Sequence, residues 1–206
     1  MNKKFILSTS LILLVGLAVF VSALSTDSQH NVKLNLNKGW NLVGMYAFDD
    51  SFSDLTNSGF IEVAYIYDNI NKEYIQLYPN RDVGKIASSG ILERWGTTAV
   101  WIYTKEAREF APSSIDQPAQ LSSIQLKQGW NFLSITPEMW NKAFNDFKGS
   151  CDIQKIYGYE QNNWAGLSLT FPINHEELIG SGLIVKVSSD CTLSSSTSGV
   201  NPPALP

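Results

Sequence analysis

Few residues in this chain are of types and spacings that could catalyse a reaction. The two histidines are His30 and His175, and His175 precedes Glu176 and Glu177. A histidine beside carboxylates could transfer protons, but acidic residues are also common at the start of a helix, where they interact favourably with the helix dipole. The sequence contains no nucleophile elbow, phosphate-binding loop, dinucleotide fingerprint or His-Glu-x-x-His motif. We therefore expect a protein that is not an enzyme and that needs no cofactor.

Oxygen ligands for a cation gather in two predicted loops. They are Asp49, Asp50 and Asp54 in one loop, and Asp68, Asn69, Asn71 and Glu73 in the other. Neither group matches a calcium loop, because the glycine that gives an EF-hand its sharp turn does not follow Asn71. Asp and Asn are ordinary turn residues, so we expect no metal site. Loop carboxylates such as Asp49, Asp68 or Glu93 leave an alternative function open, a small secreted hydrolase.

The N-terminus has the pattern of an export signal. Two lysines precede an apolar run over residues 5–21, which ends in the small residues Ser22 and Ala23. A basic start, an apolar run and a small-residue exit are typical of a cleaved signal peptide. The run is shorter than the roughly 20 apolar residues of a membrane helix. We predict a signal peptide over residues 1–23, with an uncleaved membrane anchor as the alternative.

Two cysteines, Cys151 and Cys191, are the only ones in the sequence. In an exported protein a cysteine pair favours a disulfide, and closing a loop of this length would restrict the unfolded chain by about 4 kcal/mol. Two buried free thiols are the alternative. Two cysteines and two histidines without a recurring ligand spacing do not predict a zinc site.

The charge of the chain argues against one class of partner. The formal net charge is −4 at pH 7, and after Lys3 and Lys4 the basic residues are scattered singly along the sequence. Because nucleic-acid binding requires clustered basic residues that neutralise phosphates, we expect no nucleic-acid partner. A mildly acidic surface is typical of a soluble secreted protein.

A duplicated sequence pattern predicts the strands and turns that position these residues. Residues 33–42 end in Lys-Gly-Trp-Asn-Leu and residues 124–133 end in Gln-Gly-Trp-Asn-Phe-Leu. Apolar residues alternate before each glycine, which predicts a strand, and a glycine in the left-handed conformation would close a three-residue turn into a return strand. The sequence therefore predicts one hairpin in each copy, with its loop at residues 37–39 or 127–129. The repeated residues that mark these turns are Gly39, Trp40 and Asn41 in the first copy, and Gly129, Trp130 and Asn131 in the second.

Further strands are predicted after each turn. The first copy continues with a hairpin over residues 63–78 and a closing strand over 99–103, and the second copy has counterparts over 156–169 and 183–187. Helices should be subordinate. The best candidate begins at Thr136, with Pro137 in its first position, and ends near Gly149. Shorter candidates are residues 52–57, residues 91–95 and a turn that begins at Asn174.

Aromatic residues are abundant, with 6 Trp, 8 Tyr and 10 Phe. We interpret Trp40, Trp101 and Trp130 as core residues, since they alternate with apolar positions on predicted strands. Other aromatics could lie on the opposite strand face, where they would form an exposed ridge suited to stacking on sugar rings or meeting a protein partner. These candidate ligand-binding residues are Tyr65, Tyr67, Tyr74, Tyr78 and Trp164.

The combined pattern of Lys-Gly-Trp-Asn-Leu, a Tyr-x-Tyr hairpin and a Gly-x-x-Ala-Val-Trp-Ile-Tyr closing strand resembles the Gly-Trp-Asn repeat module of exported and cell-envelope proteins of prokaryotes. The resemblance covers about two thirds of the chain and implies tandem β modules without shared catalytic residues. The second copy departs from it, because Leu183, Ile184 and Val185 stand where the first copy has an aromatic strand. A ligand face using those aromatics would then belong to the first copy alone.

The predicted organisation follows from these elements. The fold class is mainly β, with two tandem small β-sheet or barrel-like repeats and one or two short helices in each. The predicted parts are a signal peptide (1–23), a polar lead-in (24–31), a first repeat (32–106), a Pro-containing linker (107–122), a second repeat (123–191) and a disordered Ser- and Pro-rich tail (192–206).

The sequence favours an exported binding or structural module of the cell envelope or cell surface. Its expected partner is a cell-surface glycan or an envelope protein, and it would contact a membrane only if the signal segment stayed uncleaved. Alternatives are the secreted hydrolase and a membrane-anchored stalk or assembly subunit.

Overall fold

The structure is a computed structural model that describes residues 33–45, 57, 59–111 and 120–194. The predicted signal peptide, the lead-in, the loop with Asp49, Asp50 and Asp54, and most of the helix candidate over residues 52–57 lie outside the described residues. The described residues all belong to one compact unit. We call residues 33–110 the first repeat and residues 121–194 the second repeat.

Each repeat contains six strands and short helical segments within the described residues. The first repeat consists of β1 Leu34–Leu36, β2 Gly39–Gly44, β3 Ile61–Asp68, β4 Glu73–Tyr78, α3 Val83–Ser88, η2 Leu92–Thr97, β5 Ala99–Thr104 and β6 Arg108–Phe110. The second consists of η3 Leu121–Ser123, β7 Gln125–Leu126, β8 Gly129–Ser134, η4 Pro137–Met139, α4 Phe144–Phe147, β9 Ile153–Glu160, β10 Asn163–Leu167, η5 Glu176–Leu178, β11 Gly182–Val187 and β12 Cys191–Thr192.

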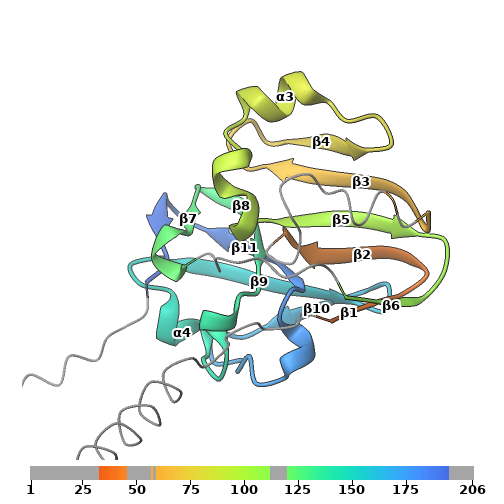
Figure 1. Ribbon diagram of the computed structural model, residues 1–206. Helices are drawn as coiled ribbons and strands as arrows, with labels where there is room; N and C mark the ends of the chain where they lie inside the picture. Colours follow the sequence, from red (N-terminus) through yellow and green to blue (C-terminus); the bar gives the residue numbers. More distant parts are fainter. Residues whose placement is uncertain (1–32, 46–56, 58, 112–119, 195–206) are drawn as a thin grey trace, which may run out of the picture. The chain divides into compact units, whose positions relative to one another are not determined.

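The two repeats have the same topology, and the predicted mainly β, two-repeat fold is confirmed. The first repeat has an antiparallel sheet in the order β2-β5-β3-β4, and the second has one in the equivalent order β8-β11-β9-β10 (Figure 1). A two-stranded sheet accompanies each, β1 with β6 and β7 with β12. Chain duplication therefore extends from the sequence pattern to the order of every strand.

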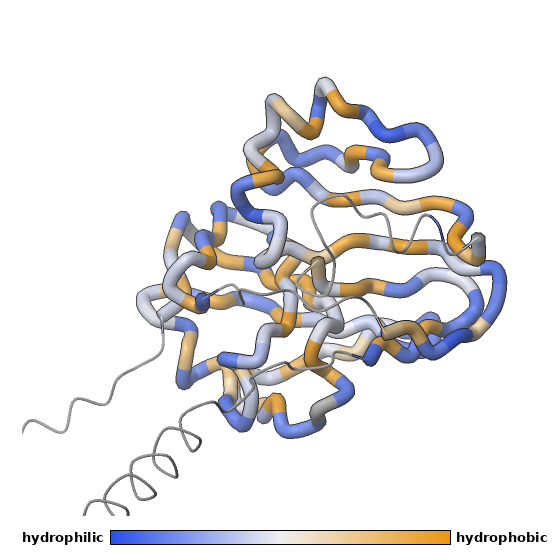
Figure 2. Tube along the Cα trace, in the orientation of Figure 1, coloured by the Kyte–Doolittle hydropathy of each residue, from blue (hydrophilic) through white to orange (hydrophobic). Residues whose placement is uncertain are grey.

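Alternating hydrophobicity builds a separate core for each repeat. Along β3, buried residues alternate with more exposed ones, and the tube in Figure 2 shows hydrophobic and hydrophilic residues alternating along the strands. One face of the first sheet packs under β1, α3 and η2 through Val43, Ile66, Ile86 and Trp95. The second sheet buries Leu133, Phe144, Phe147 and Val185 in the same way. Each sheet thus has one face committed to its own core.

The glycine turns are corners and not the hairpins that we predicted. Gly39 and Gly129 have φ values of 101° and 93°, which confirms the left-handed conformation. However, β1 pairs with β6, whereas β2 pairs with β5, so the chain leaves one sheet and enters another at the turn. An asparagine side chain inside each turn bonds the turn's own backbone groups, as described below, which removes the need for a paired return strand.

The other strand predictions agree with the structure. The hairpins β3–β4 and β9–β10 are both antiparallel pairs, and the closing strands β5 and β11 are present. These closing strands lie inside their sheets, each between two partners. The strand that comes last along the sequence in each larger sheet is therefore central in that sheet. Its near-continuous apolar run suits a strand that is covered on both faces.

The helix predicted from Thr136 to Gly149 is wrong as a single element. The chain forms η4 and α4 instead, and Asn141 between them has a φ of 54°, which a continuous helix does not allow. The Thr136 side chain makes no capping hydrogen bond. The α3 helix, which we did not predict, begins after Asp82, whose carboxylate accepts a hydrogen bond from the backbone of Lys85.

Two predicted boundaries are also corrected. The first residues of the predicted linker form β6, because Arg108–Phe110 satisfies the backbone of β1. The predicted tail begins too early, since Thr192 belongs to β12 and the Leu193 side chain is fully buried in the second core. Burial of the Leu193 side chain offsets the conformational entropy that is lost when this polar segment becomes ordered.

Cys151 and Cys191 form a disulfide, with their Cα atoms 5.3 Å apart. The bond ties the segment before β9 to β12 at the edge of the second core. No helix within the described residues is sufficiently long and apolar to span a membrane. A disulfide-bonded β protein of this kind is compatible with an extracellular location.

Candidate functional site: an aromatic groove between the repeats

The sheet faces turned away from the two cores carry the aromatic side chains, and these two faces meet. The contact is centred on four buried residues, Leu42 and Ala99 from the first repeat with Phe132 and Ile184 from the second. Tyr67, Trp101, Trp130 and Tyr159 are half-buried around them. Successive side chains of a strand point to opposite faces of the sheet. The side chains at this contact therefore point away from the separate core of their own repeat.

Small residues allow the repeats to approach closely at one end of this contact. The backbone nitrogen of Gly44 donates to the carbonyl of Gly180 at 2.7 Å. A Cβ atom on Gly44 would lie 2.2 Å from Ser134 Oγ, and one on Gly182 would lie 2.7 Å from the Ala99 Cβ. Both distances are shorter than side-chain packing tolerates, so glycine is required where the two sheets touch.

A first cavity of about 410 Å³ opens beside this contact. All four strands of the larger sheet of the first repeat supply rings, and the β9–β10 hairpin of the second repeat closes the other side. The lining consists of Trp40, Tyr65, Tyr74, Trp101, Tyr159 and Trp164. Its walls are therefore built by both repeats.

A second cavity of about 540 Å³ is related to the first by the duplication. It is lined by Tyr67, Tyr74, Trp130, Phe132, Tyr157, Trp164 and Ile184. Trp130 occupies the position of Trp40 in the repeated turn, and Tyr157 pairs with Ile184 as Tyr65 pairs with Trp101. Tyr74 and Trp164, which are equivalent by register, line both cavities. We call the two cavities together the aromatic groove.

The rings of the groove contact one another mostly edge to face. Trp101 meets Tyr159 with ring centroids 4.8 Å apart and an interplanar angle of 85°, and it meets Trp164 at 5.6 Å and 85°. Trp40 meets Trp101 at 6.1 Å and 84°. Such T-shaped pairs are the favoured geometry of aromatic clusters. They hold the rings in place and leave ring faces open in more than one direction.

Several of these rings are exposed enough to meet a ligand. Tyr74 is 52% exposed, Trp164 is 51% exposed and Trp40 is 36% exposed. Burial of large aromatic side chains is strongly favourable, so three such rings on one surface make the groove a candidate binding site.

Two phenols of the groove, Tyr67 and Tyr74, have raised pKa values. Burial raises the pKa of Tyr67, and the neighbouring Tyr74 and Asp68 raise it further. Burial also raises the pKa of Tyr74, against a hydrogen bond with Trp101 that lowers it. Both phenols thus stay protonated at neutral pH and can donate hydrogen bonds. No carboxylate, imidazole or thiol lines either cavity within the described residues.

The predicted ligand residues divide into two groups. Tyr65, Tyr67, Tyr74 and Trp164 all line the groove. Tyr78 does not, because a register shift in the β3–β4 pair precedes it and its ring packs against the first core. The structure thus brings together four of these side chains, which the sequence placed on separate hairpins.

The interpretation of three tryptophans as core residues is corrected by the structure. Trp40, Trp101 and Trp130 lie on the sheet faces that form the groove. The expectation that an aromatic face would belong to the first repeat alone is also wrong, since Trp130, Phe132, Tyr157 and Tyr159 contribute from the second. Strand alternation gives the face of a residue, but it does not say which of two faces is covered.

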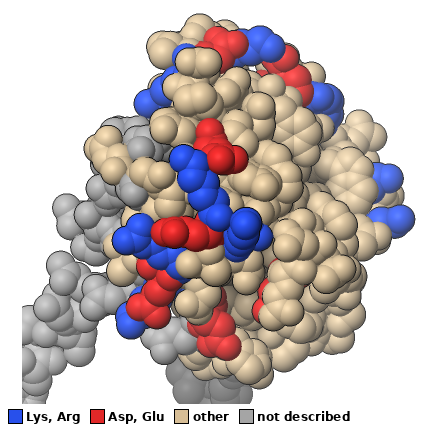
Figure 3. Space-filling view, turned by 90° about the vertical axis from the view of Figure 1, so that its right-hand side faces the viewer, with Lys and Arg blue, Asp and Glu red and all other residues tan. Residues whose placement is uncertain are grey.

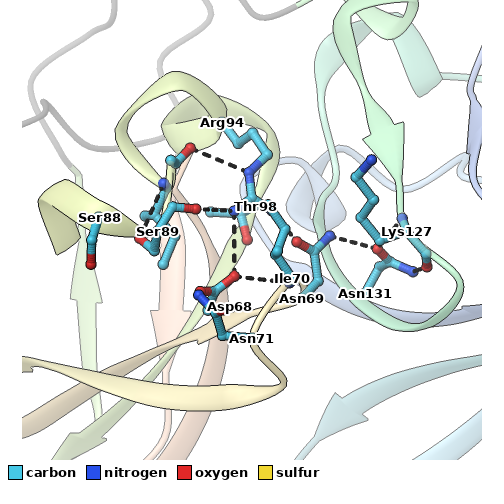
Figure 4. Close-up of polar contacts among 12 residues, drawn as sticks. Asp68, Asn69, Ile70, Asn71, Ser88, Ser89, Arg94, Thr98, Lys127 and Asn131 are labelled. Atoms are coloured by element: carbon cyan, nitrogen blue, oxygen red, sulfur yellow. Dashed lines mark hydrogen bonds and ion pairs between the residues drawn. The ribbon is translucent and has the colours of Figure 1, made fainter. Parts of the chain in front are cut away.

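A polar network that is buried at Asn69 and Asn131 links the two repeats (Figure 4). Asn69, in the β3–β4 turn, donates to Asn131 Oδ1 of the second repeat at 2.7 Å. The Arg94 guanidinium bonds to Asn69 Oδ1, and its Nη2 lies 3.6 Å from Asp68 Oδ1. Lys72 in the same turn donates to the Gln128 carbonyl at 2.7 Å. The turn of one repeat therefore docks on the glycine corner of the other.

Each glycine corner is held by its asparagine. Asn131 accepts from the Lys127 nitrogen at 2.8 Å and donates to the carbonyls of Lys127 and Gly129 at 2.7 and 3.0 Å. Asn41 makes the same three bonds, to the backbone of residues 37 and 39. The sequence marked both asparagines as repeat-turn residues but gave no sign of this role.

The carboxylates of the alternative hydrolase do not line the groove. The Asp68 side chain is fully buried, and it accepts hydrogen bonds from Ile70 and Asn71 besides its pairing with Arg94. Glu93 is exposed on η2, and Asp49 lies outside the described residues. His175 is exposed on the surface, with Nδ1 3.3 Å from Glu177 Oε1.

The charged residues and the potential metal ligands form no further candidate site in the described part of the chain. Blue and red groups lie beside one another on the face shown in Figure 3, without a stripe of one sign. Among the described residues, no three His, Cys, Asp or Glu side chains are grouped to hold a metal ion. The aromatic groove is therefore the candidate functional site.

Comparison of this chain with protein-family models, with curated proteins and with solved structures found no match.

Proposed function

We propose that this protein is an exported, non-catalytic binding module of the cell envelope or cell surface, and that its aromatic groove binds a glycan. The observation that supports the proposal is the pair of cavities lined almost wholly by aromatic rings from both repeats. The apolar faces of sugar rings stack on aromatic rings, while phenol hydroxyls can bond to sugar hydroxyls at the edge of the stack. The resemblance to the Gly-Trp-Asn repeat module and the signal-like N-terminus support the location.

The chemistry of the groove favours binding over hydrolysis. Glycoside hydrolysis needs two carboxyl groups flanking the scissile bond, and the described lining of the groove has none. A bound glycan would therefore be held without being cleaved.

A glycan-binding measurement with the mature chain tests the proposal. Cell-wall polysaccharides and their oligomers should bind the wild-type protein, and Trp164→Ala should weaken that binding about tenfold or more, as expected for the loss of a stacking ring. Leu92→Ala is the matched control, because Leu92 is 51% exposed like Trp164 but does not line the groove.

Three outcomes would overturn the proposal. Binding that is unaffected by Trp164→Ala would place the glycan elsewhere. Binding of envelope proteins and of no glycan would make the groove a protein-docking site. Release of sugar products by the wild-type chain would favour the hydrolase.

A further inference from the structure

Equivalent strand positions in and beside the two cavities carry different residues, and one of these differences is a charge. Asn41 pairs with Ile102 on β5 as Asn131 pairs with Val185 on β11. One residue earlier, the first repeat has Trp101 where the second has Ile184. One residue later, the first repeat has Tyr103 where the second has Lys186.

In the second repeat, Lys186 is cross-strand partner to Trp130 and places its ammonium group over the indole, 5.8 Å from the ring centroid. That distance is within the range of a cation–π contact. A positive charge thus already lies at the tryptophan that lines the second cavity, so a second cation beside it would be repelled.

In the first repeat, the equivalent partner of Trp40 is the neutral Tyr103, with ring centroids 5.3 Å apart and an angle of 78°. The six residues that line the first cavity are all Trp or Tyr. Rings that meet at nearly right angles, such as Trp40 with Trp101 and Trp101 with Trp164, present their electron-rich faces from different sides. A cation surrounded by several such faces is bound by cation–π attraction.

We propose that the first cavity is a cage for an organic cation, an ammonium or methylated ammonium substituent carried by the ligand, and that the second cavity accepts only the neutral part of that ligand. The proposal deepens the proposed function, since it assigns a positive charge to the glycan. It rests on that function in one respect, namely that the groove is the ligand-binding site. The net charge of −4 also favours a positive ligand.

Small probes test the cage without any glycan. Choline and tetramethylammonium should bind the wild-type chain with saturation, followed by calorimetry or by tryptophan fluorescence at constant ionic strength. The neutral isostere 3,3-dimethylbutan-1-ol, which has the shape of choline without its charge, should bind at least about tenfold more weakly.

Single substitutions in the two repeats locate the cation. Trp101→Ile gives the first cavity the residue of the second and should weaken choline binding about tenfold, and Trp40→Leu, at a 36% exposed position, should do the same without loss of the fold. Lys186→Tyr gives the second repeat the residue of the first and should not weaken choline binding.

Equal affinity for choline and its neutral isostere would overturn the cage, as would choline binding that survives both Trp101→Ile and Trp40→Leu. The failure of the proposed function looks different. If choline binds as expected and no glycan binds, the cage stands and the glycan proposal falls. If neutral glycans bind at Trp164 and choline does not bind, the reverse holds.

Discussion

The two repeats share a strand order but are held together by different means. The second repeat closes its core with the disulfide between Cys151 and Cys191. The first repeat, which has no cysteine, has the buried Asp68 paired with Arg94 beside its own core. The duplicated topology therefore depends on the alternating strands and the glycine corners that both repeats share, whereas the contacts that reinforce each repeat differ.

The asparagine corners show the same division. The fourth hydrogen bond of Asn41 goes to Thr104 Oγ1 at 3.3 Å, within its own repeat. The fourth bond of Asn131 comes from Asn69, in the other repeat, because Val187 stands where the first repeat has Thr104. The corner at Asn41 is therefore bonded within its own repeat only, whereas the corner at Asn131 is also bonded to the other repeat.

The largest effect is expected from removal of the disulfide. Replacing Cys151 and Cys191 together by serine should lower the free energy of unfolding by about 4 kcal/mol, because the loop that they close gains freedom when unfolded. Native-state hydrogen exchange should show the loss first in β9 and β11. Equal loss of protection in β3 and β5 would show that the two repeats unfold as one.

Arg94→Ala should have the next largest effect, about 3 kcal/mol, because it leaves the buried Asp68 carboxylate without its cation and Asn69 without a donor. Denaturant unfolding measures it. Lys33→Ala is the control, since Lys33 pairs with Glu109 on the surface and exposed pairs contribute little. Similar losses in the two variants would contradict a structural role for the network.

The two corners should respond unequally. Asn131→Ala should cost about 2 kcal/mol and Asn41→Ala about 1 kcal/mol, since only the first change also breaks the bond between the repeats. A double-mutant cycle with Asn69→Ala isolates that bond. The cycle should show coupling of Asn69 with Asn131 and none with Asn41, and coupling with Asn41 would argue against the asymmetry.

The smallest effect concerns alkaline pH. The pKa values of Tyr67 and Tyr74 are raised in the folded protein, chiefly by burial. Their contribution to stability is therefore complete below the unfolded pKa near 10 and is lost as pH rises through the folded pKa. Phenolate absorbance should rise at higher pH in the folded chain than in the urea-unfolded chain, and Tyr67→Phe and Tyr74→Phe should each remove part of that delay. Coincident titration curves would refute it.

Part of the groove could be predicted because strand alternation is local. Tyr65, Tyr67 and Tyr74 fall on one face of a hairpin whose register follows from its turn. Trp101, Tyr157 and Tyr159 could have been added by the same alternation, if the sheet face opposite each core had been treated as a second contact surface. Tyr78 was misplaced because the irregularity between Ala64 and Tyr65 changes the register of its pair.

The duplication, most of the strands, the left-handed glycines and the cysteine pair could be predicted from the amino-acid sequence, because each depends on residues close in the chain or on composition. Three features could not be predicted in this way: β1 and β2 belong to different sheets, β5 and β11 are central, and the two aromatic faces meet in one groove. Those outcomes depend on which distant strands pair and which faces pack, and contacts such as Asn69 with Asn131 leave no periodic trace in the sequence.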